Sequence, residues 1–134
     1  MGVIFDTSVL IEAERGRFDA IGFTAGKKKE PFGLSAISVS ELLHGVHRAD
    51  TEKRRLKRSA FVEKTIELFP IYPFDKSVAR VYAKLWSGLL QKGLNIGAHD
   101  LMIGATAISL GFSVATFNVR HFSRIVGLDL EVLT

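Results

Sequence analysis

The sequence contains no cysteine, which excludes disulfide bonds and thiolate metal sites. It has no apolar run of the roughly 18 residues that a membrane span requires. Its N-terminus also lacks the basic segment followed by a long apolar segment that marks a secretory signal. We therefore expect a cytoplasmic protein that has no association with membranes.

The size and composition of the chain predict a single folded unit. With 134 residues, the chain is long enough for one domain with a substantial core and too short for two. Because 47% of its residues are hydrophobic and its mean hydropathy is +0.21, it is expected to form a compact globule. No internal repeat or linker interrupts it, so residues 1–134 are predicted to be one domain.

Positive charge exceeds negative charge, with a formal net charge of +4 and a pI of about 9.6. The basic residues gather at Lys27–Lys29 and, more densely, within residues 48–58. Such a surface attracts phosphate backbones without sequence preference, although a charge run of this size is more often a solvated helix face. We expect the helix predicted at residues 51–68 to carry this charge on its outer side.

Apolar patterning alternates between strand-like and helix-like segments from one end of the chain to the other. Strands are predicted at residues 3–5, 34–37, 70–74, 112–116 and 130–133. Helices are predicted at residues 9–16, 38–48, 51–68, 76–91 and 98–110. Residues 18–33 are predicted to be partly helical, and residues 118–125 to form a loop or a short turn. This alternation predicts an α/β fold with a parallel sheet covered on both faces.

Two helix starts carry recognisable capping signals, and a third helix has an unusual composition. Ser38 and Glu41 have the spacing of a capping box, and Asp75 is a typical N-cap residue. The helix at 98–110 is apolar nearly all round, so we expect it to be central.

Three carboxylates occupy comparable places relative to these elements. Asp6 follows the first strand, Glu41 lies early in the helix after the second strand, and Asp100 lies in the first turn of the most apolar helix. Strand carboxyl ends and the helix starts that follow them share one edge of a parallel sheet. Each acid also has a structural interpretation, because Asp6 can cap a helix, Glu41 can complete a capping box and Asp100 can complement a helix dipole.

Converging carboxylates repel one another unless a cation lies between them. Oxygen ligands without cysteine favour Mg²⁺ or Mn²⁺ over zinc. Such an ion can polarise a phosphodiester and lower the pKa of a bound water. An acidic site within a basic surface therefore indicates phosphodiester hydrolysis.

Four stretches of the chain resemble, in order, the successive motifs of PIN-domain ribonucleases, most closely those of the VapC toxins of toxin–antitoxin pairs. They are FDTSVLI at residues 5–11, ISVSELLHG at 37–45, IGAHDLMIGATA at 96–107 and TFNVRHF at 116–122. The resemblance covers essentially the whole chain. It implies a three-layer α/β/α PIN fold with a central parallel sheet of about five strands.

The resemblance also implies an activity, a cofactor and partners. It implies an endoribonuclease that depends on Mg²⁺ or Mn²⁺ and hydrolyses RNA phosphodiester bonds, a homodimer, and a VapB-type antitoxin as protein partner. Carried over by motif, Asp6, Glu41 and Asp100 are the metal-binding and catalytic acids, and Thr7 or Ser8 is expected to orient Asp6.

The fourth motif departs from the family pattern. Asn118 stands where many relatives place another acid, and it is carried over as the fourth catalytic position. Its amide can offer an oxygen but no charge, so a second metal is expected to bind weakly or only with substrate. His121, like His44 and His99, is interpreted as a structural hydrogen-bonding residue. Arg120 and Arg124 are candidate phosphate contacts, and the alternative is that both lie on a solvated surface.

Two other functions compete with this one. A PIN-like module that binds RNA or protein and cuts weakly or not at all would account for the missing fourth acid. A phosphatase with Asp6 as nucleophile is disfavoured, because such enzymes often place a second aspartate where this chain has Ser8.

Overall fold

The computed structural model describes residues 1–27 and 29–134, so the middle lysine of the Lys27–Lys29 cluster lies outside the described residues. The strands are β1 (Val3–Phe5), β2 (Phe32–Ser35), β3 (Ile71–Tyr72), β4 (Ser113–Thr116) and β5 (Leu130–Val132). The helices are α1 (Thr7–Glu14), α2 (Ala20–Ala25), α3 (Ala36–His47), α4 (Glu52–Leu68), α5 (Lys76–Gln91), α6 (Ala98–Leu110) and α7 (Val119–Phe122). The predicted alternation of strands and helices is confirmed.

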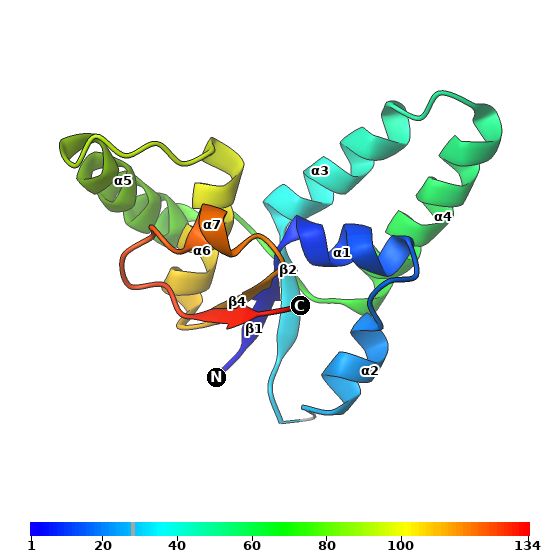
Figure 1. Cartoon of the computed structure of the whole chain (residues 1–134), viewed down its shortest axis with the longest axis horizontal. Coiled ribbons are helices and arrows are strands. Elements are labelled where there is room, and N and C mark those ends of the chain that lie inside the picture. Colours follow the sequence, from blue (N-terminus) through cyan, green and yellow to red (C-terminus); the bar gives the residue numbers. More distant parts are fainter. Residues whose placement is uncertain (28) are drawn as a thin grey trace.

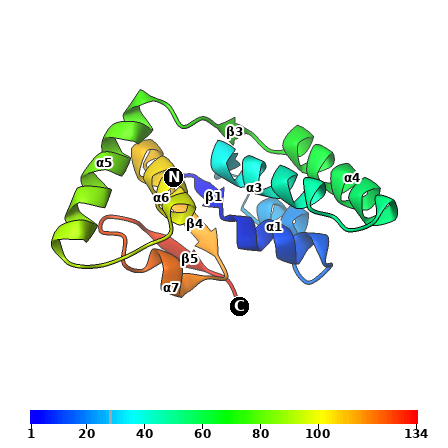
Figure 2. The ribbon, with the colours of Figure 1, turned by 90° about the horizontal axis from the view of Figure 1, so that it is seen from above.

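The strands form one parallel five-stranded sheet in the order β3-β2-β1-β4-β5. Helices α1 to α4 lie on one side of it, and α5, α6 and α7 lie on the other (Figures 1 and 2). The predicted three-layer α/β/α architecture is therefore confirmed. None of the helices in the described part of the chain is both long and apolar enough to cross a membrane.

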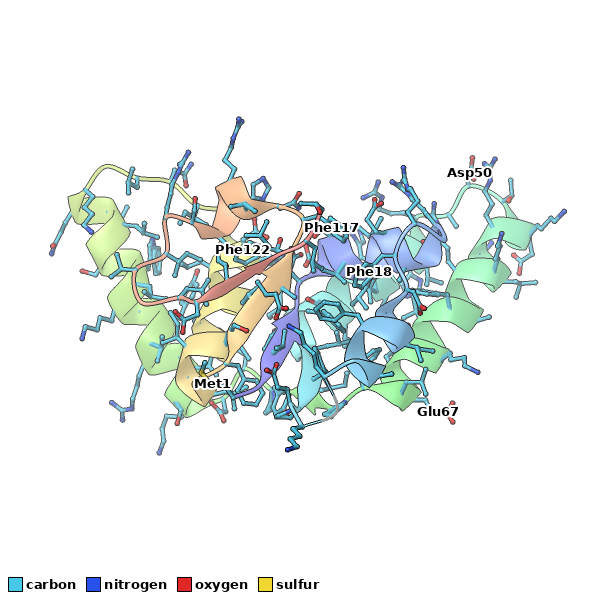
Figure 3. All side chains as sticks on the ribbon, turned by 60° about the horizontal axis from the view of Figure 1, so that its bottom comes forward. Met1, Phe18, Asp50, Glu67, Phe117 and Phe122 are labelled. Carbon is cyan, nitrogen blue, oxygen red and sulfur yellow. The ribbon has the colours of Figure 1, made fainter. Side chains whose placement is uncertain are left out.

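Successive residues of β1 point to opposite faces of the sheet, so their side chains belong to two separate hydrophobic cores. Phe5 packs into the core beneath α1 to α4, while Ile4 packs into the core beneath α5 and α6. In the first core the Phe5 ring stacks on Phe32, with ring centroids 5.4 Å apart. Phe18 and Phe117, labelled in Figure 3, meet edge to face with centroids 5.6 Å apart at the rim of this core. β1 is buried on both faces, as its uninterrupted apolar run predicts.

The second strand was placed two residues too late by the sequence pattern, and the capping box after it is wrong. β2 ends at Ser35, whose side chain accepts a hydrogen bond from the Ile37 N–H and caps α3. Ser38 lies inside the first turn of α3 and is fully buried, so it cannot act as the N-cap. Glu41 is therefore not the return arm of a capping box.

The start of β2 was missed because it contains Gly33, which in a sequence suggests a loop. In the structure a Cβ at this position would lie 2.4 Å from the Tyr72 ring and 2.9 Å from the Pro70 carbonyl oxygen. Glycine here allows β3 to approach β2 closely. Gly33 thus allows β2 and β3 to pack together and does not interrupt β2.

The basic helix α4 presents its charge to solvent as predicted, but its buried face differs from the one that its apolar residues suggest. Its basic residues are exposed, which confirms the outward-facing charge. The apolar residues Leu56 and Leu68 are 62% and 52% exposed, however, whereas Val62 and Thr65 are buried. The apolar residues of this helix are too loosely periodic to indicate its buried face.

Candidate active site

Three elements bring the predicted acids to the carboxyl edge of the sheet. Asp6 follows β1 directly, Glu41 lies in the second turn of α3, and Asp100 lies in the first turn of α6. Figure 1 shows the starts of α1 and α3 beside the upper ends of β1 and β2. The three acids thus lie at the same edge of the sheet, and the contacts of each acid define how it is held.

Asp6 is the most deeply buried of the three acids, with 3% of its surface exposed. Its Oδ1 accepts a hydrogen bond from the Ser8 N–H at 2.7 Å, and its Oδ2 accepts one from the Ser8 hydroxyl at 2.8 Å. The Thr116 hydroxyl also donates to Oδ2. Asp6 therefore caps α1, as the structural interpretation proposed, and at the same time lies in the candidate site.

Thr116 joins Asp6 to the fourth motif. Its Oγ1 accepts a hydrogen bond from the Asn118 N–H at 2.7 Å while its hydroxyl donates to Asp6. The sequence did not indicate that Thr116 contacts Asp6. The parallel register that pairs Phe5 with Ala115 places the next residues of both strands, Asp6 and Thr116, side by side. A hydroxyl residue directly after an apolar strand is the sequence signal that could have identified it.

Burial raises the pKa of Asp6, because an ionised carboxylate is poorly solvated inside the protein. The hydrogen bonds from Thr116 and Ser8 act in the opposite direction and favour the charged form. The negative charge of Asp100 raises the pKa of Asp6 further, although this is the smallest of the contributions. Asp6 and Asp100 are thus close enough to repel each other.

Glu41 is held by residues from α1 and α6. The Thr7 hydroxyl donates to Glu41 Oε1 at 2.6 Å, and the same hydroxyl oxygen lies 3.0 Å from Ser38 Oγ. His99 Nδ1 lies 3.5 Å from Glu41 Oε2. Ser8 contacts Asp6 whereas Thr7 contacts Glu41, so of the two hydroxyl residues predicted to orient Asp6, Ser8 does so.

Asp100 is held by the short helix α7. Its Oδ2 lies 2.8 Å from His121 Nδ1, which identifies His121 as a hydrogen-bonding residue, as predicted. What the sequence did not indicate is that the partner is one of the candidate catalytic acids. Asn118 is the exposed N-cap residue of α7, and its side chain makes no capping hydrogen bond. Its catalytic role stays a prediction.

The donor chemistry of this site suits a hard divalent cation, although the side chains are not gathered around a single point. Among the residues that the structure describes, no three Asp, Glu, His or Cys side chains come close enough together to hold a metal ion. Glu41 is turned toward Thr7, and Asp100 toward His121. The carboxylate oxygens nevertheless match Mg²⁺ or Mn²⁺, and a cation would relieve the repulsion between Asp6 and Asp100.

Two hollows in the protein surface each include one of the three acids in their walls, and Asp6 lines neither. The larger, of about 500 Å³, lies between α1, α3 and α4 and includes Glu41 and His99 in its wall. The smaller, of about 320 Å³, lies between the start of α6 and α7 and includes Asp100 and His121. A third hollow, of about 460 Å³, lies against α5, is mostly apolar and includes none of the three acids.

Comparison with known proteins identifies the family. The model of the PIN domain family matches residues 3–128. "Ribonuclease VapC1" of Rickettsia felis is 42% identical over 100% of this chain and 96% of that protein, and "tRNA(fMet)-specific endonuclease VapC" of Salmonella typhimurium is 33% identical over 73% of this chain and 72% of that protein. The crystal structure of VapBC2 from Rickettsia felis bound to a promoter DNA fragment contains a chain with a TM-score of 0.90, 26% identity and full coverage of both chains. The chain therefore belongs to the PIN-domain family and, within it, to the VapC group.

Proposed function

We propose that this chain is a metal-dependent endoribonuclease, the toxin of a VapBC-type toxin–antitoxin pair, which hydrolyses RNA phosphodiester bonds. The observation that carries this proposal is that Asp6, Glu41 and Asp100 all lie at one edge of the sheet, with Glu41 and Asp100 in the walls of hollows that arginines also line. The names of its relatives, which include ribonucleases and a tRNA-specific endonuclease, support RNA as the substrate. A VapB-type antitoxin as partner and a cytoplasmic site of action are part of the same proposal.

The three acids would hold Mg²⁺ or Mn²⁺, and the neighbouring residues would hold the acids. When bound, the cation would polarise the phosphodiester and neutralise charge on the departing oxygen. Ser8 and Thr116 orient Asp6 and favour its ionised form by donating hydrogen bonds to it. Because Asn118 carries no charge, a second ion would bind weakly or only together with the substrate.

The proposal is tested by incubating the purified chain with mixed cellular RNA in the presence of Mg²⁺, Mn²⁺ or EDTA. We expect internal cleavage with either metal and none with EDTA. RNA binding without cleavage, by folded protein freed of any antitoxin, would instead favour the alternative of a PIN-like module that binds RNA or protein.

Replacing Thr116 by valine tests whether this residue positions Asp6. The change removes a hydrogen bond that lowers the pKa of Asp6, so this pKa should rise further. We expect kcat/KM to fall by roughly ten- to a hundredfold, as for other residues that orient metal ligands. The acidic limb of the pH–rate profile should move to higher pH, since more alkali is needed to ionise Asp6.

Thr106→Val is the matched control for this experiment. Thr106 is also fully buried, but its hydroxyl donates to the Met102 carbonyl oxygen within α6. This variant should leave the pH–rate profile in place. Equal shifts in both variants would mean that Thr116 acts only through general packing.

Three apolar residues of the middle helices, Leu42, Phe61 and Trp86, are candidates for the dimer surface, and the structure places them in different surroundings. Leu42 is buried in the core of its own chain and Phe61 packs partly against that core, so neither provides a free apolar surface. Trp86 on α5 is 54% exposed and contacts Tyr82 with the two rings tilted by 43°, while Leu90, one turn further on, is 66% exposed. We propose that the homodimer forms through this face of α5.

Replacing Trp86 by glutamate should therefore disrupt the dimer. Burying a charge at the centre of an aromatic contact should weaken dimerisation by roughly 30-fold or more, which sedimentation velocity would detect as a shift toward monomer. Leu56→Glu, at a comparably exposed site on α4, should leave the oligomeric state unchanged. A dimer that survives in the Trp86 variant at low concentration would show that α5 is not its interface.

A further inference from the structure

Within the described part of the chain, the two hollows beside Glu41 and Asp100 share no lining residue, but two neighbouring residues of the chain connect them. His99 belongs to the larger hollow and Asp100, the next residue, to the smaller. Glu41 thus lies in the wall of one hollow and Asp100 in the wall of the other, and the neighbouring residues His99 and Asp100 form the boundary between them. A chain molecule bound at this point has room to continue on both sides of it.

Basic side chains exceed acidic ones in both hollows. Arginines at positions 15, 48 and 58 line the larger hollow, together with Glu14 and Glu41. In the smaller hollow, Arg120 and Arg124 face a single carboxylate, that of Asp100. Both hollows thus offer guanidinium groups, which match the geometry of phosphate oxygens.

One arginine in each hollow is anchored by the backbone. Arg58 Nη1 donates to the Gly45 carbonyl oxygen at 3.1 Å, and Arg124 Nη1 donates to the Asn95 carbonyl oxygen at 3.4 Å. Each guanidinium has five N–H donors, so most of them stay available for a ligand. The arginines at positions 54 and 55 on the same basic helix α4 differ, because their charges are paired with Asp50 and Glu52.

We propose that a single RNA strand lies across both hollows, with Arg58 binding a backbone phosphate on one side of the cleaved bond and Arg124 binding one on the other. This inference rests on the proposed function and specifies how its substrate is held. Among the described residues that line the two hollows there is no phenylalanine, tyrosine or tryptophan. The proposal therefore assigns the binding of the strand to its phosphates.

The arrangement has a consequence for the kind of cleavage. A strand gripped on both sides of the carboxylates is cut in its interior, whereas a strand end can fill only one of the two hollows. Arg58 and Arg124 are thus positioned to favour internal sites over strand ends. Either phosphate contact should also make binding depend on salt, because each releases condensed counterions.

The test measures binding, so it does not depend on cleavage. The Asp6→Asn chain, in EDTA, is titrated with a fluorescein-labelled single-stranded RNA of about 12 nucleotides at several salt concentrations, and anisotropy gives the affinity. Adding Arg58→Gln or Arg124→Gln should weaken binding roughly tenfold at low salt. Each should also reduce the slope of log affinity against log salt by roughly 0.7, and the two together by roughly 1.4.

Arg54→Gln is the matched control, since it removes the same charge from an exposed arginine that is already paired with Asp50. It should leave the slope unchanged. An unchanged slope in either the Arg58 or the Arg124 variant, with circular dichroism showing normal folding, would overturn the two-sided path. Failure of the wild-type chain to cut RNA would overturn the proposed function instead, while these slopes could still be measured.

Discussion

Replacing Asp6 by asparagine should abolish RNA cleavage and at the same time make the protein more stable. Cleavage should fall by more than about a hundredfold, because the variant loses a proposed metal ligand whose charge the amide cannot replace. The fold should tolerate the change, since asparagine caps helices about as well as aspartate and α1 keeps its N-cap. Loss of activity would therefore reflect chemistry and not unfolding.

The gain in stability follows from the pKa of Asp6. Burial raises this pKa in the folded state, so the ionised carboxylate opposes folding at neutral pH. Removing the charge should stabilise the protein by about 1 kcal/mol, which corresponds to a rise in Tm of about 4 °C. As the pH falls through the raised pKa, the wild-type carboxyl takes up a proton and the difference between the two proteins should close.

These expectations are checked by thermal unfolding of both proteins across the acidic pH range, without added metal, alongside an RNA cleavage assay. A variant that cleaves RNA as well as the wild type would refute the role of Asp6. A variant that is less stable than the wild type at every pH would show that the hydrogen bonds from Ser8 and Thr116 outweigh the cost of the buried charge.

Replacing Asp100 by asparagine should remove both cleavage and the response of the protein to metal. In the wild type, Mg²⁺ or Mn²⁺ at about one hundred times its dissociation constant should stabilise the fold by roughly 2.7 kcal/mol, since the ion binds only the folded chain. The corresponding rise in Tm is about 10 °C. Without the Asp100 charge the ion loses one of the two carboxylates whose mutual repulsion it would relieve, so most of this rise should disappear.

Asp75→Asn is the control for the loss of a carboxylate elsewhere. Asp75 caps α5 by accepting a hydrogen bond from the Val78 N–H at 3.0 Å, and asparagine can cap in the same way. This variant should keep both cleavage and the metal-induced rise in Tm. If the Asp100 variant shows the same rise as the wild type, the ion binds elsewhere and the proposed metal site is wrong.

Much of the fold can be predicted from local patterns, because these patterns report physical preferences that act over a few residues. The apolar run of β1 indicates a strand buried on both faces, the side chain of Asp75 marks a helix start, and the apolar composition of α6 indicates a central helix. The incorrect predictions of strand and helix starts also have local causes. Gly33 makes the start of β2 resemble a loop, and the spacing of Ser38 and Glu41 indicates a helix start three residues after the actual cap, Ser35.

The candidate site is less predictable, because its contacts join residues that are far apart along the chain. Asp6 and Thr116 are separated by 110 positions, and Thr7 and Glu41 by 34. Which side chains meet depends on the strand order β3-β2-β1-β4-β5 and on the register that pairs Phe5 with Ala115. No local pattern contains this information.

The sequence by itself determined the class of fold, the sheet edge at which chemistry should occur and the three acids that reach it. Only the tertiary structure decided that Thr116 holds Asp6, that His121 holds Asp100 and that Glu41 and Asp100 lie in the walls of two hollows lined by arginine. Secondary structure follows from backbone preferences and apolar periodicity over short stretches. Side-chain partners follow from the packing of all elements together, which sets the distances between distant parts of the chain.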